Sequence, residues 1–473
     1  MCTALASHGY VLFLLNNVQN LTMIRSRNLL LLLLALLGTL GGWAQRPPLE
    51  RYLAEGLDNN LALQRQDLAY QRSQQALREA KGLFFPQLSL VANYTLAGGG
   101  RTLDFPIGDL FNPVYATLNQ LTESQQFPTD LENVNEQFLP NNFHETKLRV
   151  VQPLFNPDLY FNRQAKAEQL RMSEAQRDAY RRELTRDIRV AYYQYLQASE
   201  VMAIYAETGE LLRELLRSNR RLVANDKATP EIIAQAEYQL AQWQSDRADA
   251  EQQQRTARAY FNFLLNRPLT SEIEIDSALQ VEQVAASLEA LQGQAQQLRP
   301  ELDQLSYAQA ANQRAVQMQR WRSLPTVNLV VDAGFQGFGY TFDEDQDFIL
   351  GRVSLNWTLF SGLQRRAQLE QVRLEQQSLG LQRQELGQQI NLQVQQAYDR
   401  VRQAQQQVAA AQSGLRSARQ SFRLVRRKYE ENQANWLELT QVRTDLTQAQ
   451  IQRAIASYGL LAQQAELAFA AGR

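Results

Sequence analysis

Apolar residues follow two periods along this chain, and one period replaces the other twice, each time at a proline. After Pro86, apolar and polar residues alternate through "QLSLVANYTL", and after Pro325 they alternate through "TVNLVVDAGF". Alternation with a period of two is typical of a β-strand with one apolar and one polar face. Before each proline, the sequence is rich in charge and glutamine and has the character of a helix. We therefore predict that helix gives way to strand at about 86–96 and 325–336.

Two further segments alternate in the same way and lead into long helical patterns. They lie at about 146–155 and 349–360, and residues 97–145 before the first of them are expected to form a long loop. Strands of about ten residues with one apolar face fit a membrane barrel with lipid outside and water inside. A soluble two-faced sheet has the same pattern. The aromatic residues expected at a membrane interface are Tyr94, Tyr340, Phe348 and Trp357.

A second pattern, with alternating steps of four and three residues, predicts long helices at 156–224 and 361–430. A mean period of 3.5 residues is the signature of coiled-coil packing, and each helix would be about 100 Å long at 1.5 Å per residue. In the first helix the pattern begins at Leu184 and Ile188. In the second it runs through Ile390, Val394, Ala397, Val401, Ala404, Val408, Ala411, Leu415, Ala418, Phe422 and Val425.

The two halves of the chain align with each other, which indicates an internal duplication. Pro86 aligns with Pro325 at an offset of 239, and Ala191 aligns with Ala397 at an offset of 206. Each copy is read as helix, strand, loop, strand, very long helix, turn and helix. The expected segments are a first copy at 45–268, a collar or linker at 269–299 with the strand-like stretch "EIEID" (272–276), and a second copy at 300–473.

Four strands in one chain cannot close a membrane barrel, because the smallest such barrels have eight strands. Open sheet edges are not tolerated in lipid. A solid fibrous coiled coil would not need amphipathic strands at all. The strands therefore favour a hollow assembly in which several copies share one barrel.

The N-terminal 44 residues predict a secretory signal rather than part of the fold. From Met23, two arginines precede an apolar core at 29–40, and small residues lead to an expected cleavage site after Ala44. Residues 1–22 are interpreted as an upstream extension from a misplaced start, or as a longer beginning of the signal. Cys2 is the only cysteine, so the mature chain is expected to have no disulfide.

Composition argues against several classes of function. The chain has 48 Lys and Arg against 49 Asp and Glu, so it lacks the excess of positive charge that is typical of a nucleic-acid-binding protein. With two histidines and one cysteine, we find no nucleophile–base set, phosphate loop or metal cluster, and we expect no enzyme activity, no metal and no cofactor. Asp343, Asp345 and Asp347 resemble the start of a calcium loop, but Phe348 stands where an EF-hand needs glycine.

The chain resembles the TolC family of bacterial outer-membrane efflux channels. The segment "LNWTLFSGLQRRAQLEQ" (355–371) is similar to the family's aromatic-x-Leu-Phe-x-Gly-Gly motif between strand and long helix, with Leu363 in place of the second glycine. The segment around Pro86 is similar to the family's LxPxL pattern. The resemblance implies a mainly α fold with a small β-barrel: a homotrimer whose twelve-stranded barrel in the outer membrane continues into a periplasmic coiled-coil barrel.

The resemblance also implies a function and partners. The protein would be the exit duct of a tripartite efflux or type I secretion system, in contact with outer-membrane lipid. Its partners would be a periplasmic membrane-fusion adaptor protein and an inner-membrane pump of the RND, ABC or MFS type. The alternative that remains is a structural or adhesive coiled-coil trimer of the cell envelope without a transport role.

In this family the functional residues lie at the periplasmic tip of the tunnel. The resemblance makes Tyr429, Glu438 and Gln441 candidates for the aperture, where Glu438 would either form an acidic ring or cap the start of a helix. The arginine of the family's Tyr–Arg–Asp lock is missing at Ala434, so no such lock is expected. The candidate adaptor contacts are Asp226, Lys227, Ala228 and Thr229 in the first turn and Asn432, Gln433, Ala434 and Asn435 in the second.

Overall fold

A computed structural model describes residues 47–276, 286–431 and 433–473. The predicted signal at 1–44 and the candidate residue Asn432 lie outside these described residues. The described chain divides into two units. One unit is helical and consists of the described part of Met1–Leu68 together with Ala175–Leu302 and Gln384–Arg473, and the other contains the sheet and consists of Ala69–Glu174 and Asp303–Arg383.

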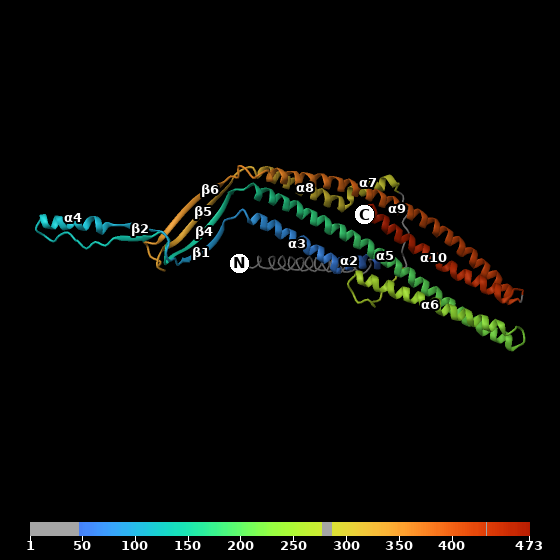
Figure 1. The fold of residues 1–473 in the computed structure, drawn as a ribbon. Coiled ribbons are helices and arrows are strands. Elements are labelled where there is room, and N and C mark those ends of the chain that lie inside the picture. Colours follow the sequence, from blue (N-terminus) through green and yellow to red (C-terminus); the bar gives the residue numbers. More distant parts are fainter. Residues whose placement is uncertain (1–46, 277–285, 432) are drawn as a thin grey trace, which may run out of the picture. The chain divides into compact units, whose positions relative to one another are not determined.

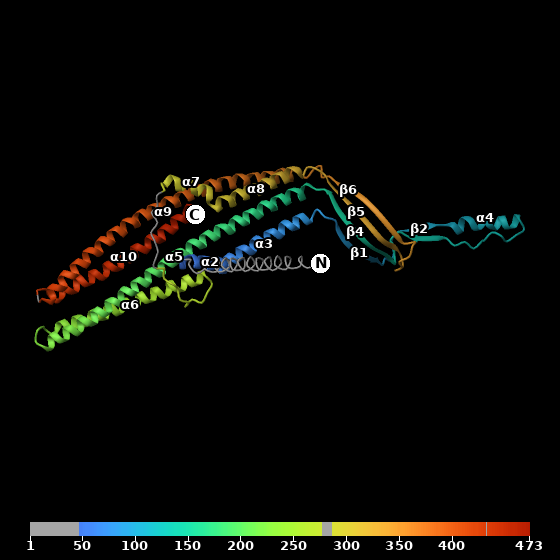
Figure 2. The same ribbon diagram turned by 180° about the vertical axis from the view of Figure 1, so that it is seen from behind.

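The helical unit is built on two helical hairpins (Figure 1; Figure 2). Helix α5 (Pro157–Ala224, 68 residues) turns back into α6 (Glu231–Leu264), and α9 (Gln364–Glu430, 67 residues) turns back into α10 (Trp436–Ala470). Both long helices are continuous, so each is about 100 Å long. The two turns lie at the same end of this unit in both views.

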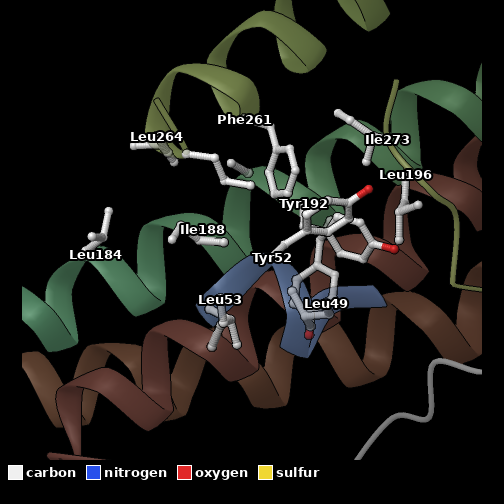
Figure 3. Close-up of a cluster of buried hydrophobic side chains, with 14 of the residues drawn as sticks. Leu49, Tyr52, Leu53, Leu184, Ile188, Tyr192, Leu196, Phe261, Leu264 and Ile273 are labelled. Carbon is white, nitrogen blue, oxygen red and sulfur yellow. The ribbon is translucent and has the colours of Figure 1, made fainter. Parts of the chain in front are cut away.

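The predicted coiled-coil seam is the buried stripe of these helices. On α9, Ile390, Val394 and Val401 are at most 2% exposed, whereas most positions between the seam residues are exposed. On α5 the stripe is wider, because Tyr192 and Leu196 are buried beside Leu184 and Ile188. Figure 3 shows the cluster that these residues form with Tyr52 of α2 (Pro48–Asn59) and Phe261 of α6.

The segment expected as a collar differs from the prediction in two ways. Residues 272–276 form no strand; they are extended and held by the hydroxyl groups of Tyr52 and Tyr192, which accept from the backbone N–H groups of Glu274 (2.8 Å) and Asp276 (3.0 Å). Residues 288–298 form helix α7 (Leu288–Leu298). At the offset of 239, α7 aligns with α2, and we infer from this that the second copy extends back to about 288.

The sheet unit contains one four-stranded antiparallel sheet in the order β1-β4-β5-β6. Its strands are β1 (Gln87–Thr95), β4 (Phe143–Phe155), β5 (Thr326–Phe338) and β6 (Asp347–Asn356). Each copy of the duplication supplies two neighbouring strands, and β4 pairs with β5 between the copies. Helices α3 (Leu61–Gly82), α5, α8 (Pro300–Trp321) and α9 all join the same end of the sheet, because they precede β1 and β5 and follow β4 and β6.

Residues 97–145 are not the plain loop that the sequence analysis predicts. They contain a two-stranded ribbon of β2 (Thr102–Phe105) and β3 (Val134–Gln137) with helix α4 (Ile107–Leu121) between the strands. This insertion extends from the end of the sheet that faces away from the helices of its unit (Figure 1). Among the described residues, no helix is long and apolar enough to cross a lipid bilayer.

Candidate functional site

The register of the sheet brings apolar residues from all four strands together on one face. Leu90 lies opposite Leu148, Leu148 opposite Ala333, and Ala333 opposite Ile349. This apolar face is open: Leu90 is 69% exposed and Ile349 is 79% exposed. A soluble sheet would cover such a face against a core, so the exposed apolar face favours contact with lipid or with another chain.

The opposite face of the sheet carries charge and is partly covered. Arg149 lies opposite Asp332 and donates to both of its carboxylate oxygens at 2.8 Å. Lys147 contacts Asp332 at 3.3 Å and also contacts Glu145. Asp332 is only 1% exposed. A charged inner row behind an apolar outer face is the arrangement of a strand that separates lipid from water.

The aromatic residues proposed for a membrane interface do not form one group. Tyr94 and Tyr340 pack edge to face at the end of the sheet that carries the insertion, with 5.7 Å between ring centroids. Trp357 lies at the helical end, where its indole donates to the carbonyl of Ser323 at 2.9 Å. Phe348 lies opposite Gly334 in the charged row, so its assignment to a lipid-facing belt is wrong.

The turn between α5 and α6 closes with a well-defined C-cap. The backbone N–H of Lys227 donates to Leu222 at 2.9 Å and that of Asp226 donates to Val223 at 3.0 Å, which is the Schellman arrangement. Asp226 has a positive φ of 56°, a conformation that Asp adopts more readily than most residues. Asp226, Lys227 and Thr229 are exposed, and Ala228 is half-buried.

The turn between α9 and α10 has an equivalent closing bond, from the N–H of Gln433 to the carbonyl of Lys428 at 2.7 Å. Asn435 then caps α10 by accepting from the backbone N–H of Glu438 at 2.9 Å. In return, the Asn435 amide donates to the Glu438 carboxylate at 3.0 Å. Glu438 is exposed, so its carboxylate both supports the cap and faces solvent. Gln433 and Asn435 are exposed, while Ala434 is half-buried.

Tyr429 lies inside the junction of the two hairpins rather than on their surface. Its hydroxyl is 3.4 Å from the side-chain oxygen of Asn219 on α5, and its ring lies against Trp436. Burial raises the pKa of Tyr429. Asn219 is fully buried and had no signal in the sequence, because a single polar residue in a long helix usually faces solvent. The surrounding apolar cluster consists of Leu215, Leu216, Ile232, Ile233, Ala236, Leu240 and Trp436.

Gln441 is hydrogen-bonded to an acidic residue, Asp445, that the sequence analysis does not identify. Its side-chain amide donates to Asp445 one turn further along α10 at 2.9 Å. Glu438, Gln441 and Asp445 are spaced by three and four residues, so they lie on one helix face, and all three are exposed. This face therefore carries two carboxylates, although aligning the family's second acidic position with Gln441 suggests only one.

Arg443 is a buried charge between the hairpins. It is 7% exposed, donates to Gln239 of α6, and no carboxylate contacts it in the part of the chain that the structure describes. Burial lowers the pKa of Arg443 to about 10. It lines a cavity of about 220 Å³ together with Tyr205, Asp246 and other residues of α5, α6 and α10. No sequence pattern distinguishes Arg443 from the many exposed arginines of these helices.

Comparison with known proteins shows that this fold is similar to that of solved outer-membrane channels. Residues 291–473 match the family described as outer membrane efflux protein. No curated protein sequence matches the chain. Its fold is similar to the open state of the MtrE outer membrane channel of Neisseria gonorrhoeae, with a TM-score of 0.74 and 18% identity over 90% of this chain and 89% of that one.

Two further solved structures give the same result. The Campylobacter jejuni CmeC outer membrane channel has a TM-score of 0.74 and 12% identity over 90% of this chain and 85% of that one. The outer membrane protein VceC of Vibrio cholerae has a TM-score of 0.70 and 15% identity over 90% and 96%. The family match over 291–473 and this shared fold confirm the resemblance to TolC-like outer-membrane channels that the sequence indicates.

Proposed function

We propose that the protein is a homotrimeric outer-membrane channel, the exit duct of a tripartite efflux or type I secretion system. The observation that carries this proposal is the four-stranded sheet, whose exposed face is apolar and whose inner face is charged. Strands β1 and β6 are its edges, and neither pairs on its outer side with another described segment. Because open edges are not tolerated in lipid, β6 of one copy would pair with β1 of the next.

Three copies of this sheet give three times four, or twelve, strands and leave no edge. The long helices that leave one end of the sheet would continue the barrel as a coiled-coil tunnel in the periplasm. The narrow buried seam of α9 supports this, since most of the remaining surface of that helix is exposed and polar. Such a helix is suited to water on two sides and to neighbours of its own kind.

The turns at the end of the two hairpins would meet the partners. Exposed Asp226, Lys227 and Thr229 in one turn, and Gln433 and Asn435 in the other, would contact a periplasmic membrane-fusion adaptor. An inner-membrane pump of the RND, ABC or MFS type would deliver the substrate through that adaptor. Glu438 would repeat three times at the aperture and attract cations there.

Recordings in planar lipid bilayers test this function. Detergent-extracted trimers should insert and conduct ions in discrete steps, because a closed barrel with a charged lumen is a water-filled pore. A structural or adhesive coiled-coil trimer would bind lipid without conducting. Trimers that insert but never conduct would contradict the duct and favour that alternative.

A further inference from the structure

Helix α4 of the insertion presents an apolar stripe that the described chain leaves largely exposed. Leu110 is 63% exposed, Val114 is 51% exposed and Leu121 is 76% exposed. With Ile107, Phe111 and Leu118 they fall within an arc of about 100° on the helix. The helix carries a single charged residue, Asp109, which lies on the other side.

The polar side of α4 is already occupied by its own chain. The Asn112 side chain bonds the backbone of Leu131 in both directions at 2.9 Å. Asn119 does the same with Phe127, at 2.8 and 3.0 Å. Gly108 lets this returning segment pass close by, because a Cβ there would lie 2.1 Å from the carbonyl oxygen of Leu131. The helix is therefore fixed with its apolar stripe outward.

The spacing of the stripe indicates which partner would cover it. Ile107, Phe111, Val114, Leu118 and Leu121 are separated by four, three, four and three residues, the spacing of the buried seam on α9. A seam of this kind packs against another helix with the same seam. In a rotationally symmetric trimer, all three copies of α4 point in the same direction and present the same stripe.

Charge argues against a lipid surface as the partner. Interfacial helices carry Lys and Arg on their polar face and bind anionic headgroups, but α4 has neither. The insertion from 97 to 145 holds seven acidic residues and one basic residue, a net charge of −6. An anionic surface would repel it.

We propose that the α4 helices of three copies pack together through this seam as a parallel three-helix bundle beyond the outer end of the sheet. This rests on the trimer proposed above. The ribbon of β2 and β3 continues from β1 and β4 and carries α4 away from the strands (Figure 2). A bundle on the symmetry axis would narrow the outer mouth, so cargo would leave between the three ribbons.

Single cysteines in the full-length protein test the bundle, since Cys2 is the only native cysteine. Val114→Cys lies in the seam, and Ala116→Cys is an equally exposed control on the opposite side of α4. After mild oxidation of outer membranes, most of the Val114→Cys protein should run as a disulfide-linked dimer, because two of three cysteines on the axis can pair. Ala116→Cys should show at least tenfold less dimer.

Native mass of the same samples separates this inference from the proposed function. An intact trimer in which Val114→Cys does not link, or links no more than Ala116→Cys, overturns the bundle and leaves the channel standing. Linkage of Val114→Cys to a different protein overturns it as well. A monomeric native mass contradicts the trimer itself.

Discussion

Glu438 takes part in the cap of α10 and is proposed to lie at the aperture, and one substitution can separate these two roles. The cap of α10 uses the side-chain oxygen of Asn435 and the backbone N–H of Glu438, and Glu438→Gln leaves both groups in place. The substitution removes one negative charge per copy and leaves an amide oxygen that can still accept from the Asn435 side chain. We expect it to lower the cation preference of the channel by roughly half while the trimer stays intact.

Single-channel reversal potentials in a salt gradient measure this preference. Asn435→Ala is the matched control, because it weakens the cap by about 1 kcal/mol and keeps the charge. Unchanged selectivity in Glu438→Gln would leave Glu438 with the capping role alone. Asp445→Asn, on the same face of α10, shows whether the second carboxylate contributes.

Arg443 should reduce the stability of the protein. Its pKa of about 10 lies below the ordinary 12.5, and this difference corresponds to roughly 3 kcal/mol. A lowered pKa means that the folded state disfavours the charged form, so the penalty is complete below pH 10 and fades as the pH rises toward 12.5. Arg443→Met should therefore stabilise the protein by about 1–3 kcal/mol at pH 7.

Chemical denaturation followed by circular dichroism checks the sign of this change. Arg453→Met is the comparison, because Arg453 contacts Glu200 and should lose stability or stay unchanged when replaced. A clear loss of stability in Arg443→Met would contradict an uncompensated buried charge. It would indicate that a neighbouring copy supplies the missing carboxylate.

At the scale of helices, the two copies of the duplication place the larger of two facing side chains on different helices of the hairpin. Gly209 of α5 leaves room for Trp243 of α6, since a Cβ on Gly209 would lie 2.2 Å from the tryptophan ring. The indole N–H also donates to the carbonyl of Tyr205 at 2.8 Å. At the offset of 206, the second copy has Leu415 and Ala449 at these positions. The larger side chain lies on the second helix of the hairpin in the first copy and on the first helix in the second copy. The summed volume of the two side chains is similar in both copies.

This exchange predicts a strong coupling between the two positions. Gly209→Leu alone should clash with Trp243, and Trp243→Ala alone should leave a cavity, each costing about 2–4 kcal/mol. The double variant reproduces the pair of the second copy and should recover at least half of the summed loss. Unfolding midpoints of the four proteins measure this. Strictly additive losses would mean that the two hairpins do not pack alike.

Periodicity explains which elements could be predicted from the sequence. The long helices and the four strands repeat a simple pattern over many residues. The pattern around Ile390 therefore predicts that it lies in the buried seam, and the pattern around Leu90 predicts that it lies on the apolar face of the sheet. The sequence pattern does not predict helix α4, because the seam of this helix spans only two heptads inside a segment rich in Gly, Asn and Pro. Helix α7 falls in the segment predicted as a collar because only two identities, of Leu49 with Leu288 and Glu50 with Glu289, relate it to α2 in sequence.

The site was less predictable than the fold for a physical reason. Tyr429 and Glu438 could be named because a family pattern points to their positions. Asn219 and Arg443 matter through contacts between helices far apart in sequence, as in the pairing of Asn219 with Tyr429 across 210 residues. Residue type and spacing along one helix carry no record of such contacts.

At the scale of the whole molecule, the two sheet edges of each copy need a partner. One copy exposes an apolar sheet face and two open edges, β1 and β6, a combination that is not expected of a stable monomer in lipid. The proposed closure by three copies would remove both edges and would turn the ion pairs of Arg149, Lys147 and Asp332 toward the lumen.

The native mass of the detergent-extracted protein tests whether three copies share one barrel. We expect a single species of three copies that resists dissociation by heat, because both sheet edges of each copy would pair with its neighbours. Weakening an edge, for example with proline at Ser89 of β1, should lower the trimer fraction, whereas proline in the exposed turn at Thr229 should not. A stable monomer that conducts as a closed barrel by itself would rule out the shared barrel.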